Sequence, residues 1–186
     1  MKRVLCLLLC ILLLSGCVHT QENMDLAMEL RSHLQQGDGC SFTAQVTADY
    51  QDEIHKFSLV CQEDSTGKMQ FSVMQPDSIK GITGYISADN AALTFDDTVL
   101  AFSPLADGQI APVVAPWLVL HSLKSGYLSA TSDGEDGYII YIDDAYFRQT
   151  VRVIINIDSN NCPAGAEIYW QGRQILSLQI QNFAYV

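Results

Sequence analysis

Basic residues are scarce in this sequence, which has 10 Lys and Arg against 21 Asp and Glu and a formal net charge of −11. Proteins that bind nucleic acid or anionic lipid surfaces neutralise phosphates with Lys and Arg, and this deficit opposes such binding. The acidic residues are scattered, mostly where turns are expected, so they indicate a solvated surface and not a site. We therefore do not expect nucleic acid as a partner.

Signatures of catalysis and of metal binding are also missing. The four histidines have no pair at metal-ligand spacing, and the chain contains no CxxC, HExxH or GxSxG motif. His121 lies in an apolar segment, where a lone histidine is more often packed and hydrogen-bonded than functional. Asp143 and Asp144 are better explained by a turn than as paired acids, and the acidic stretch 133–136 lacks EF-hand spacing. We expect no enzyme, no metal and no cofactor.

The chain has no apolar run of the roughly 20 residues that span a bilayer. Its longest run, residues 4–14, follows Lys2 and Arg3 and has the length and flanks of a signal peptide. The run ends in LSGC, residues 14–17, which resembles the bacterial lipobox, whose cysteine is acylated before the chain is cut on its N-terminal side. An ordinary secretory signal with an incidental cysteine is the alternative.

The lipobox predicts a covalently attached lipid such as palmitate on Cys17. Residues 1–16 are then a lipoprotein signal peptide, and residues 17–21 form a lipidated tether. The chain would be exported and anchored to a bacterial membrane, at the outer face of the cytoplasmic membrane or at an outer membrane. Such a compartment permits disulfides.

Residues 20–36 place apolar side chains at helical spacing and predict an amphipathic helix. From Cys40 the apolar period falls to two, which predicts two strands joined as a hairpin. If the turn centres between Tyr50 and Gln51, Cys40 lies directly opposite Cys61, a favourable position for a disulfide. Two buried free thiols, or a bond that involves Cys162, are the alternatives.

Further short β-rich segments follow, two of them closed by Pro76 and Pro104, before an apolar helix is predicted within residues 112–126. The rest returns to strands, with turns at Gly134, at Asp143–Asp144, in residues 159–165 and at 171–172. The sequence thus predicts an α+β fold in which an antiparallel, curved sheet of about 10–11 strands forms a half-closed barrel. Two or more helices would plug its concave face, and residues 22–186 would form a single domain.

This order of elements, with FSVMQPDSIKGITGYIS (71–87), AFSP (101–104) and AEIYWQGRQILSLQIQNF (166–183), resembles the half-barrel family of bacterial lipoprotein carriers and their lipid-anchored receptors (LolA/LolB-like). The same fold occurs in periplasmic regulators of sigma-factor signalling. The resemblance implies an apolar cavity that accepts a lipid, an acyl chain or an acylated polypeptide. Its own predicted anchor distinguishes this chain from the soluble carriers and makes it more similar to the receptors, or to an unassigned lipoprotein with the same fold.

Two functions remain open. In the first, the anchored protein binds a hydrophobic ligand in its cavity; in the second, the core is filled and the domain binds a protein partner. Aromatic and aliphatic residues are the candidates for the cavity lining, although each on its own is more often a core residue. The candidates are Phe42, Phe57, Leu59, Phe71, Trp117, Leu120, Tyr141 and Trp170.

Overall fold

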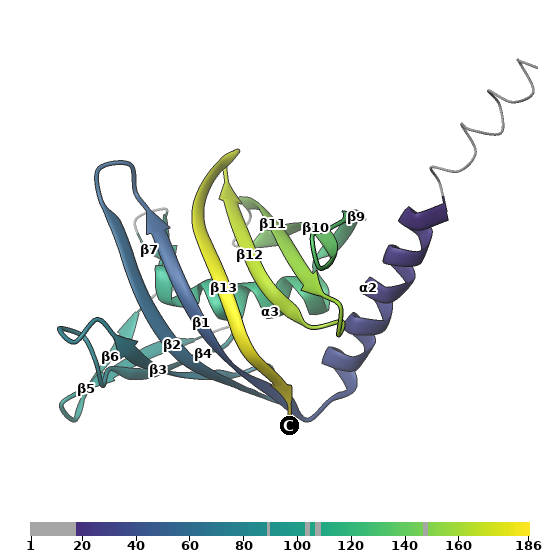
Figure 1. Cartoon of the computed structure of the whole chain (residues 1–186). Coiled ribbons are helices and arrows are strands. Elements are labelled where there is room, and N and C mark those ends of the chain that lie inside the picture. The colour runs from purple at the N-terminus through teal and green to yellow at the C-terminus, as the bar shows by residue number, and fades with distance from the viewer. Residues whose placement is uncertain (1–17, 89, 103–104, 107–108, 147–148) are drawn as a thin grey trace, which may run out of the picture.

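The structure is a computed structural model that describes residues 18–88, 90–102, 105–106, 109–146 and 149–186. The predicted signal peptide and Cys17 lie outside the described residues. Within them, two α-helices, α2 and α3, accompany an eleven-stranded antiparallel sheet and a two-stranded ribbon. Figure 1 shows the curved sheet with α3 running across its concave side.

The chain builds the sheet as two arms. The N-terminal arm comprises β1 (Gly39–Asp49), β2 (Ile54–Asp64), β3 (Met69–Gln75), β4 (Thr83–Ile86), β5 (Ala91–Phe95) and β6 (Thr98–Phe102). The C-terminal arm comprises β9 (Tyr127–Asp133), β10 (Gly137–Tyr146), β11 (Gln149–Asp158), β12 (Pro163–Trp170) and β13 (Arg173–Tyr185). The short ribbon β7 (Leu105–Ala106) and β8 (Gln109–Ile110) precedes a 3-10 turn, η1 (Pro112–Val114).

The first and last strands join the two arms. β1 pairs with β13 as well as with β2, so both lie in the middle of the order β6-β5-β4-β3-β2-β1-β13-β12-β11-β10-β9. The outermost strands, β6 and β9, do not pair with each other, which leaves the barrel half closed. The predicted fold is therefore confirmed.

Strict alternation along β1 fixes which face of the sheet carries the core. Cys40, Phe42 and Ala44 are buried, and the residues between them are less so. Side chains point alternately to the two faces of a strand, so the face that carries Phe42 is the concave, apolar one.

The helix α3 (Ala115–Ser125) fills this concave face. Pro116 stands in its first turn, where no amide hydrogen is needed, and Gly126 follows its last residue. Eight of its eleven residues are buried, among them Trp117 and Leu120. A helix that buries most of its residues is stable only when other elements surround it, and here the sheet and α2 (Val18–Gln36) do so.

The predicted register of the first hairpin is wrong. The turn centres between Gln51 and Asp52, one residue later than predicted, because Tyr50 N–H donates to the Glu53 carbonyl and Gln51 adopts a positive φ of 75°. Cys40 therefore lies opposite Glu63.

The same register places Phe42 opposite Cys61, so the two cysteines are diagonal neighbours on the concave face. Both are buried free thiols in the structure. A diagonal pair is further apart than a directly opposed pair, which explains why the predicted disulfide is not formed here.

The predicted turn at Asp143–Asp144 is also wrong, because β10 continues through both residues to Tyr146. Asp143 pairs across the strands with Arg152, whose Nε lies 2.9 Å from its Oδ1. Asp144 accepts a hydrogen bond of 2.9 Å from Ser122 in α3. The two carboxylates point to opposite faces of the sheet, as adjacent strand residues must.

Candidate functional site

The concave interior, where the sequence predicts a cavity, is packed with side chains. Six of the eight predicted lining residues are buried in one continuous core: Phe42, Leu59, Phe71, Trp117, Leu120 and Trp170. Phe57 is half-buried and packs at the edge of this core. Tyr141 is half-buried and lies between the buried Ile140 and Ile142, so it points away from the concave face.

Polar contacts at both ends hold α3 against the sheet. Near its start, Trp117 Nε1 donates to the Gly67 carbonyl at 3.0 Å, and its ring stacks on His121 at 4.7 Å. His121 is thus a packed residue, as predicted. At its end, Lys124 forms an ion pair with Glu63 of β2. The apolar plug is therefore tied to the N-terminal arm by its first and last turns.

The helix α2 contacts the C-terminal end of α3, the end that also carries Lys124. Arg31 Nε donates to the Leu123 carbonyl at 2.6 Å, and a terminal nitrogen of Arg31 donates to the Gly126 carbonyl at 2.7 Å. Gln35 donates to the Lys124 carbonyl at 2.6 Å. The last carbonyls of a helix have no partner within the helix, so these side chains act as a C-terminal cap supplied by α2.

The Glu63 and Lys124 pair lies deep in the fold. The side chain of Glu63 is 2% exposed and that of Lys124 is 19% exposed. Cys40 lies close enough for the pair to act on it: burial, and then the Glu63 charge, raise the pKa of its thiol to about 12. Burial and then Cys40 also raise the pKa of Cys61.

The chemistry of the three described cysteines can be checked by alkylation. Cys40 and Cys61 are buried and their raised pKa values keep them protonated near neutral pH, while Cys162 is half-exposed. Burial and Asp158 raise the pKa of Cys162 as well. Because the thiolate is the reactive form, we expect slow labelling of Cys162 by iodoacetamide and none of Cys40 or Cys61 until the protein is unfolded. Peptide mass mapping measures this, and rapid labelling of Cys40 would contradict the structure.

The apolar concave face extends beyond the area that the helices cover. Strand pairing places Cys61, Phe71, Gly84, Leu93 and Leu100 in one row across β2 to β6. Cys61 and Phe71 are buried, Leu93 is half-buried and Leu100 is 62% exposed. The row therefore runs from the core to the surface without a charged residue. We call its exposed end, formed by Leu93, Phe95, Leu100 and Phe102 of the β5–β6 hairpin, the open apolar end.

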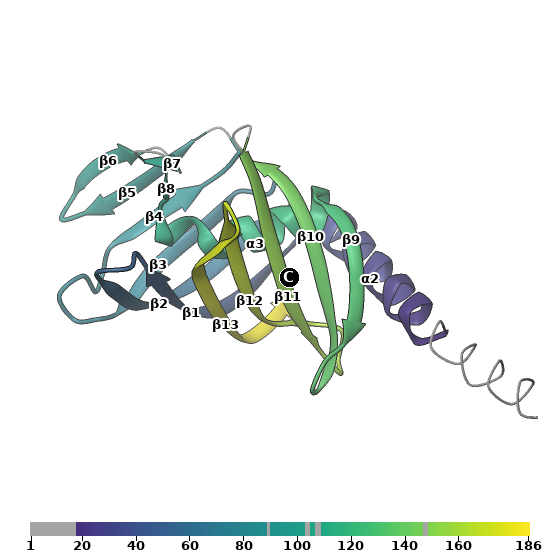
Figure 2. The ribbon, with the colours of Figure 1, turned by 90° about the horizontal axis from the view of Figure 1, so that it is seen from above.

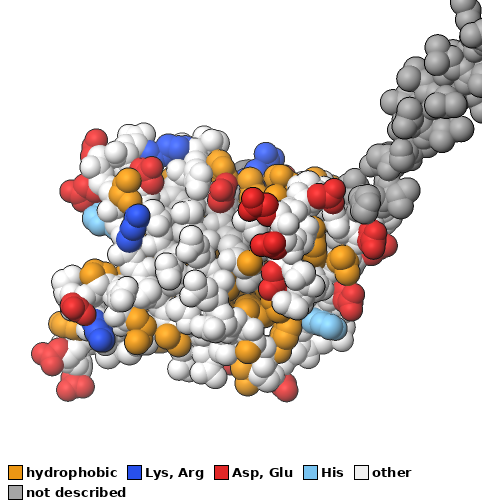
Figure 3. All heavy atoms as spheres, viewed as in Figure 1, with side chains coloured by type: hydrophobic (Ala, Val, Ile, Leu, Met, Phe, Trp, Pro, Cys, Tyr) orange, Lys and Arg blue, Asp and Glu red, His pale blue; other side chains and the backbone are white. Residues whose placement is uncertain are grey.

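The hairpin that carries the open apolar end projects from the body of the protein (Figures 1 and 2). Its loop is only Asp96 and Asp97, both with positive φ, since Phe95 pairs with Thr98. Two-residue loops of this kind match the twist of the flanking strands, and Asp tolerates the left-handed conformation. Acidic side chains outnumber Lys and Arg on the face seen in Figure 3.

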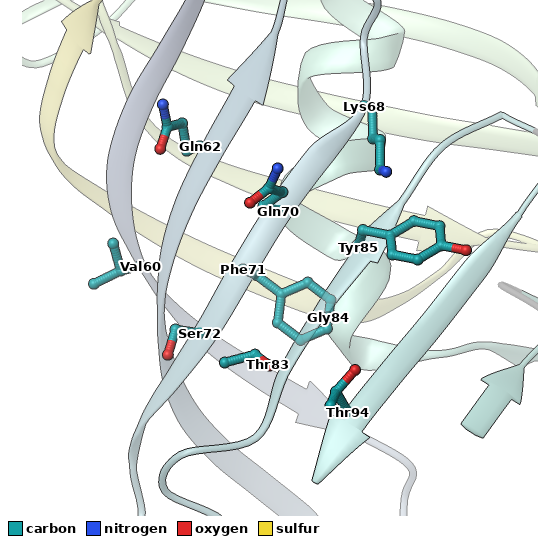
Figure 4. A pocket seen from close by; sticks show the side chains of 10 residues that line it. All are labelled: Val60, Gln62, Lys68, Gln70, Phe71, Ser72, Thr83, Gly84, Tyr85 and Thr94. Carbon is teal, nitrogen blue, oxygen red and sulfur yellow. The ribbon is translucent and has the colours of Figure 1, made fainter. Parts of the chain in front are cut away.

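Open grooves of about 460, 490 and 500 Å³ are among those that the described residues form on the outer face of the sheet. No residue of α3 lines any of them. Figure 4 shows the first, where the Lys68 ammonium lies 4.2 Å from the centroid of the Tyr85 ring. Its lining residues are Val60, Gln62, Lys68, Gln70, Phe71, Ser72, Thr83, Gly84, Tyr85 and Thr94.

Gly84 has a steric role beneath this groove. A Cβ at this position would lie 2.4 Å from the Ala92 carbonyl oxygen and 2.6 Å from the Phe71 ring, so only glycine fits. The ring of Phe71 occupies the space that a side chain would take.

Metal and membrane-spanning features are not found in the part of the chain that the structure describes. No group of His, Cys, Asp or Glu there could hold a metal ion. None of the helices described has both the length and the apolar character needed to cross a bilayer.

Comparison with known proteins identifies the fold. No family model and no curated protein sequence matches this chain. A putative outer membrane lipoprotein-sorting protein domain from Vibrio parahaemolyticus matches with a TM-score of 0.51 at 12% identity, over 89% of this chain and 92% of that one. An uncharacterized conserved protein from Thermus thermophilus matches with a TM-score of 0.49 at 12% identity, over 89% of this chain and 86% of that one.

A LolA superfamily protein from Nitrosomonas europaea matches with a TM-score of 0.46 at 11% identity, over 84% of this chain and 90% of that one. Likeness at such low identity concerns the fold alone and leaves the function open. The sheet order, the unclosed barrel and the enclosed apolar helix agree with the predicted resemblance. The chain has a LolA-like half-barrel fold.

Proposed function

We propose that this chain is an exported, lipid-anchored protein that binds a hydrophobic ligand on the concave face of its half-barrel. The ligand is a lipid, an acyl chain or an acylated polypeptide, and Cys17 carries the anchor. Binding involves no covalent chemistry and needs no cofactor.

The observation that carries this proposal is the open apolar end. The concave face is apolar from the buried Cys61 to the exposed Leu100, and no charge interrupts it. Exposed, contiguous apolar surface of this kind usually marks a binding site. An aliphatic chain can lie along it with the helices in place, and deeper burial follows if α3 moves away from the sheet.

A few polar contacts restrict the movement of α3 away from the sheet. Its end is held by Arg31 and by the Lys124 and Glu63 pair, and its start by the Trp117 hydrogen bond. Ser122 and Gln35 add a hydrogen bond each, to Asp144 and from α2 to the Lys124 carbonyl. Most of the buried residues of α3 are apolar, and an aliphatic ligand can take the place of their contacts. The packed interior is thus the closed state of the proposed site.

A matched pair of neighbours in β6 tests the proposal. Leu100, 62% exposed, lies on the concave face, whereas Val99, 66% exposed, lies on the outer face of the same strand. We expect Leu100→Lys to weaken binding of a fluorescent long-chain fatty acid about tenfold, because the ammonium would have to be desolvated beneath the ligand. Val99→Lys should leave the affinity unchanged.

The measurement is a fluorescence titration of the full chain purified from an exporting bacterium, with native mass spectrometry of the untreated protein. A co-purified lipid or acylated peptide supports the proposal. If the wild-type chain takes up no fatty acid and carries no lipid, the proposal is wrong. A protein partner is then the remaining function, since the tightly packed interior favours a filled interaction domain.

A further inference from the structure

From the exposed edge of β6, we infer that this strand is a docking site for an extended, cationic polypeptide segment, which adds to the sheet as a further strand. This site differs from the proposed ligand site. The ligand would contact the concave face alone, whereas the added strand would pair with the main chain of β6 and contact side chains on both of its faces.

The two edges of the sheet differ in how they are covered. Beside β9, α2 packs along the edge, and Asn23 of α2 donates to Asp133 of β9 at 2.9 Å; Figure 2 shows the helix next to this strand. At β6, the residues Thr98 to Ala101 are all exposed. Of the two edge strands described, β9 has a helix packed beside it and β6 has none, so the outward-facing amide and carbonyl groups of β6 are the more open to another chain.

The strand β6 itself lacks the charges, the proline and the bulge that often protect an edge strand. Its residues, TVLAF, include no lysine, no other charge and no proline, and the pairing with β5 is regular without a bulge. Val99 is exposed on the outer face and Leu100 on the concave face. A strand with such an edge pairs readily with an extended segment, whose alternate side chains would contact these two residues.

The negative charge around β6 indicates which kind of segment would bind there. Asp96 and Asp97 form the tip of the hairpin, next to the first residue of β6, and the whole chain has a formal net charge of −11. A segment with Lys or Arg beside its β-forming residues is attracted over several ångströms and pairs with the acidic tip. A second copy of this chain has the same acidic tip and the same net charge, so it is the less favourable occupant.

The test uses a fluorescent peptide in which valine and threonine alternate between lysine-rich ends, titrated against the full chain. We expect saturable binding, a weakening of about tenfold in both Val99→Lys and Leu100→Lys, and a clear loss at high salt. The matched control is Ile54→Lys, since Ile54 is 63% exposed but belongs to an interior strand. This variant should bind the peptide as the wild-type chain does.

Two further probes define the mode of binding. A peptide with glutamate in place of lysine, and one with N-methylated central amides, should both bind at least about tenfold more weakly. Equal binding of the N-methylated peptide overturns strand addition, and undiminished binding in both β6 variants overturns the site. Self-association of the chain that the β6 variants abolish, without peptide binding, overturns the proposed occupant in favour of a second copy.

Strand addition at β6 and ligand binding on the concave face can be tested separately. Val99→Lys should lose the peptide and keep the fatty acid, because Val99 faces away from the concave side. Substitutions of exposed residues rarely change stability by more than about 0.5 kcal/mol, and thermal unfolding of each variant confirms that it is folded.

Discussion

Replacing Lys124 with methionine is expected to lower the free energy of unfolding by about 3–5 kcal/mol. Glu63 is 2% exposed and forms an ion pair with Lys124. Methionine removes the positive charge and leaves the carboxylate in an apolar interior, where solvation by water cannot replace its partner. Urea denaturation of the wild-type and variant chains measures the difference.

The double variant Glu63→Gln/Lys124→Met is the control for this prediction. It removes both charges, and replacing a whole buried pair with neutral residues of similar size is often close to neutral. We therefore expect it to recover most of the lost stability. If Lys124→Met is as stable as the wild-type chain, the ion pair does not stabilise the closed position of α3.

Replacing Trp117 with alanine, as a single substitution, is expected to lower the free energy of unfolding by about 3–5 kcal/mol. The ring is 2% exposed, stacks on His121 and donates a hydrogen bond of 3.0 Å to the Gly67 carbonyl. Alanine leaves a cavity between α3 and the N-terminal arm and a carbonyl without its donor. Thermal unfolding followed by circular dichroism provides the measurement.

Trp117→Phe separates the two contributions. Phenylalanine keeps an aromatic ring against His121 but has no donor for Gly67, so we expect a smaller loss, with the missing hydrogen bond accounting for about 1 kcal/mol. An equal loss in the two variants would mean that the hydrogen bond, and not the volume of the ring, determines the stability at this position.

Much of the fold could be predicted because its signals are local. A period of two marks β1 and β2, and the apolar segment with Pro116 near its start and Gly126 after its end marks α3. These features depend on neighbouring residues, which the sequence displays directly.

The register of the first hairpin could not be predicted in the same way. Moving the turn by one residue shifts the pairing by two positions, so each side chain keeps its face and the alternating pattern is unchanged. Only the geometry of the turn at Gln51 distinguishes the two registers. The prediction that Cys40 opposes Cys61 failed for this reason.

The turn predicted at Asp143 and Asp144 failed because their partners are distant in the sequence. Arg152 from the next strand and Ser122 from α3 compensate the two carboxylates within β10. The open apolar end was missed for a related reason. Its apolar row crosses five strands and becomes visible only when all their registers are known.

The central position of β1 and β13 has a consequence for how the chain folds. Each arm is a series of neighbouring hairpins, whose pairings form between residues close in the sequence and are therefore fast. The seam between the arms, in contrast, brings Cys40 opposite Tyr185 and must close a loop that contains almost the whole domain. Until β13 arrives, one side of β1 is an unpaired edge in a strand rich in buried residues. Chains truncated before β13 should therefore aggregate during export, even though every strand of the N-terminal arm is present.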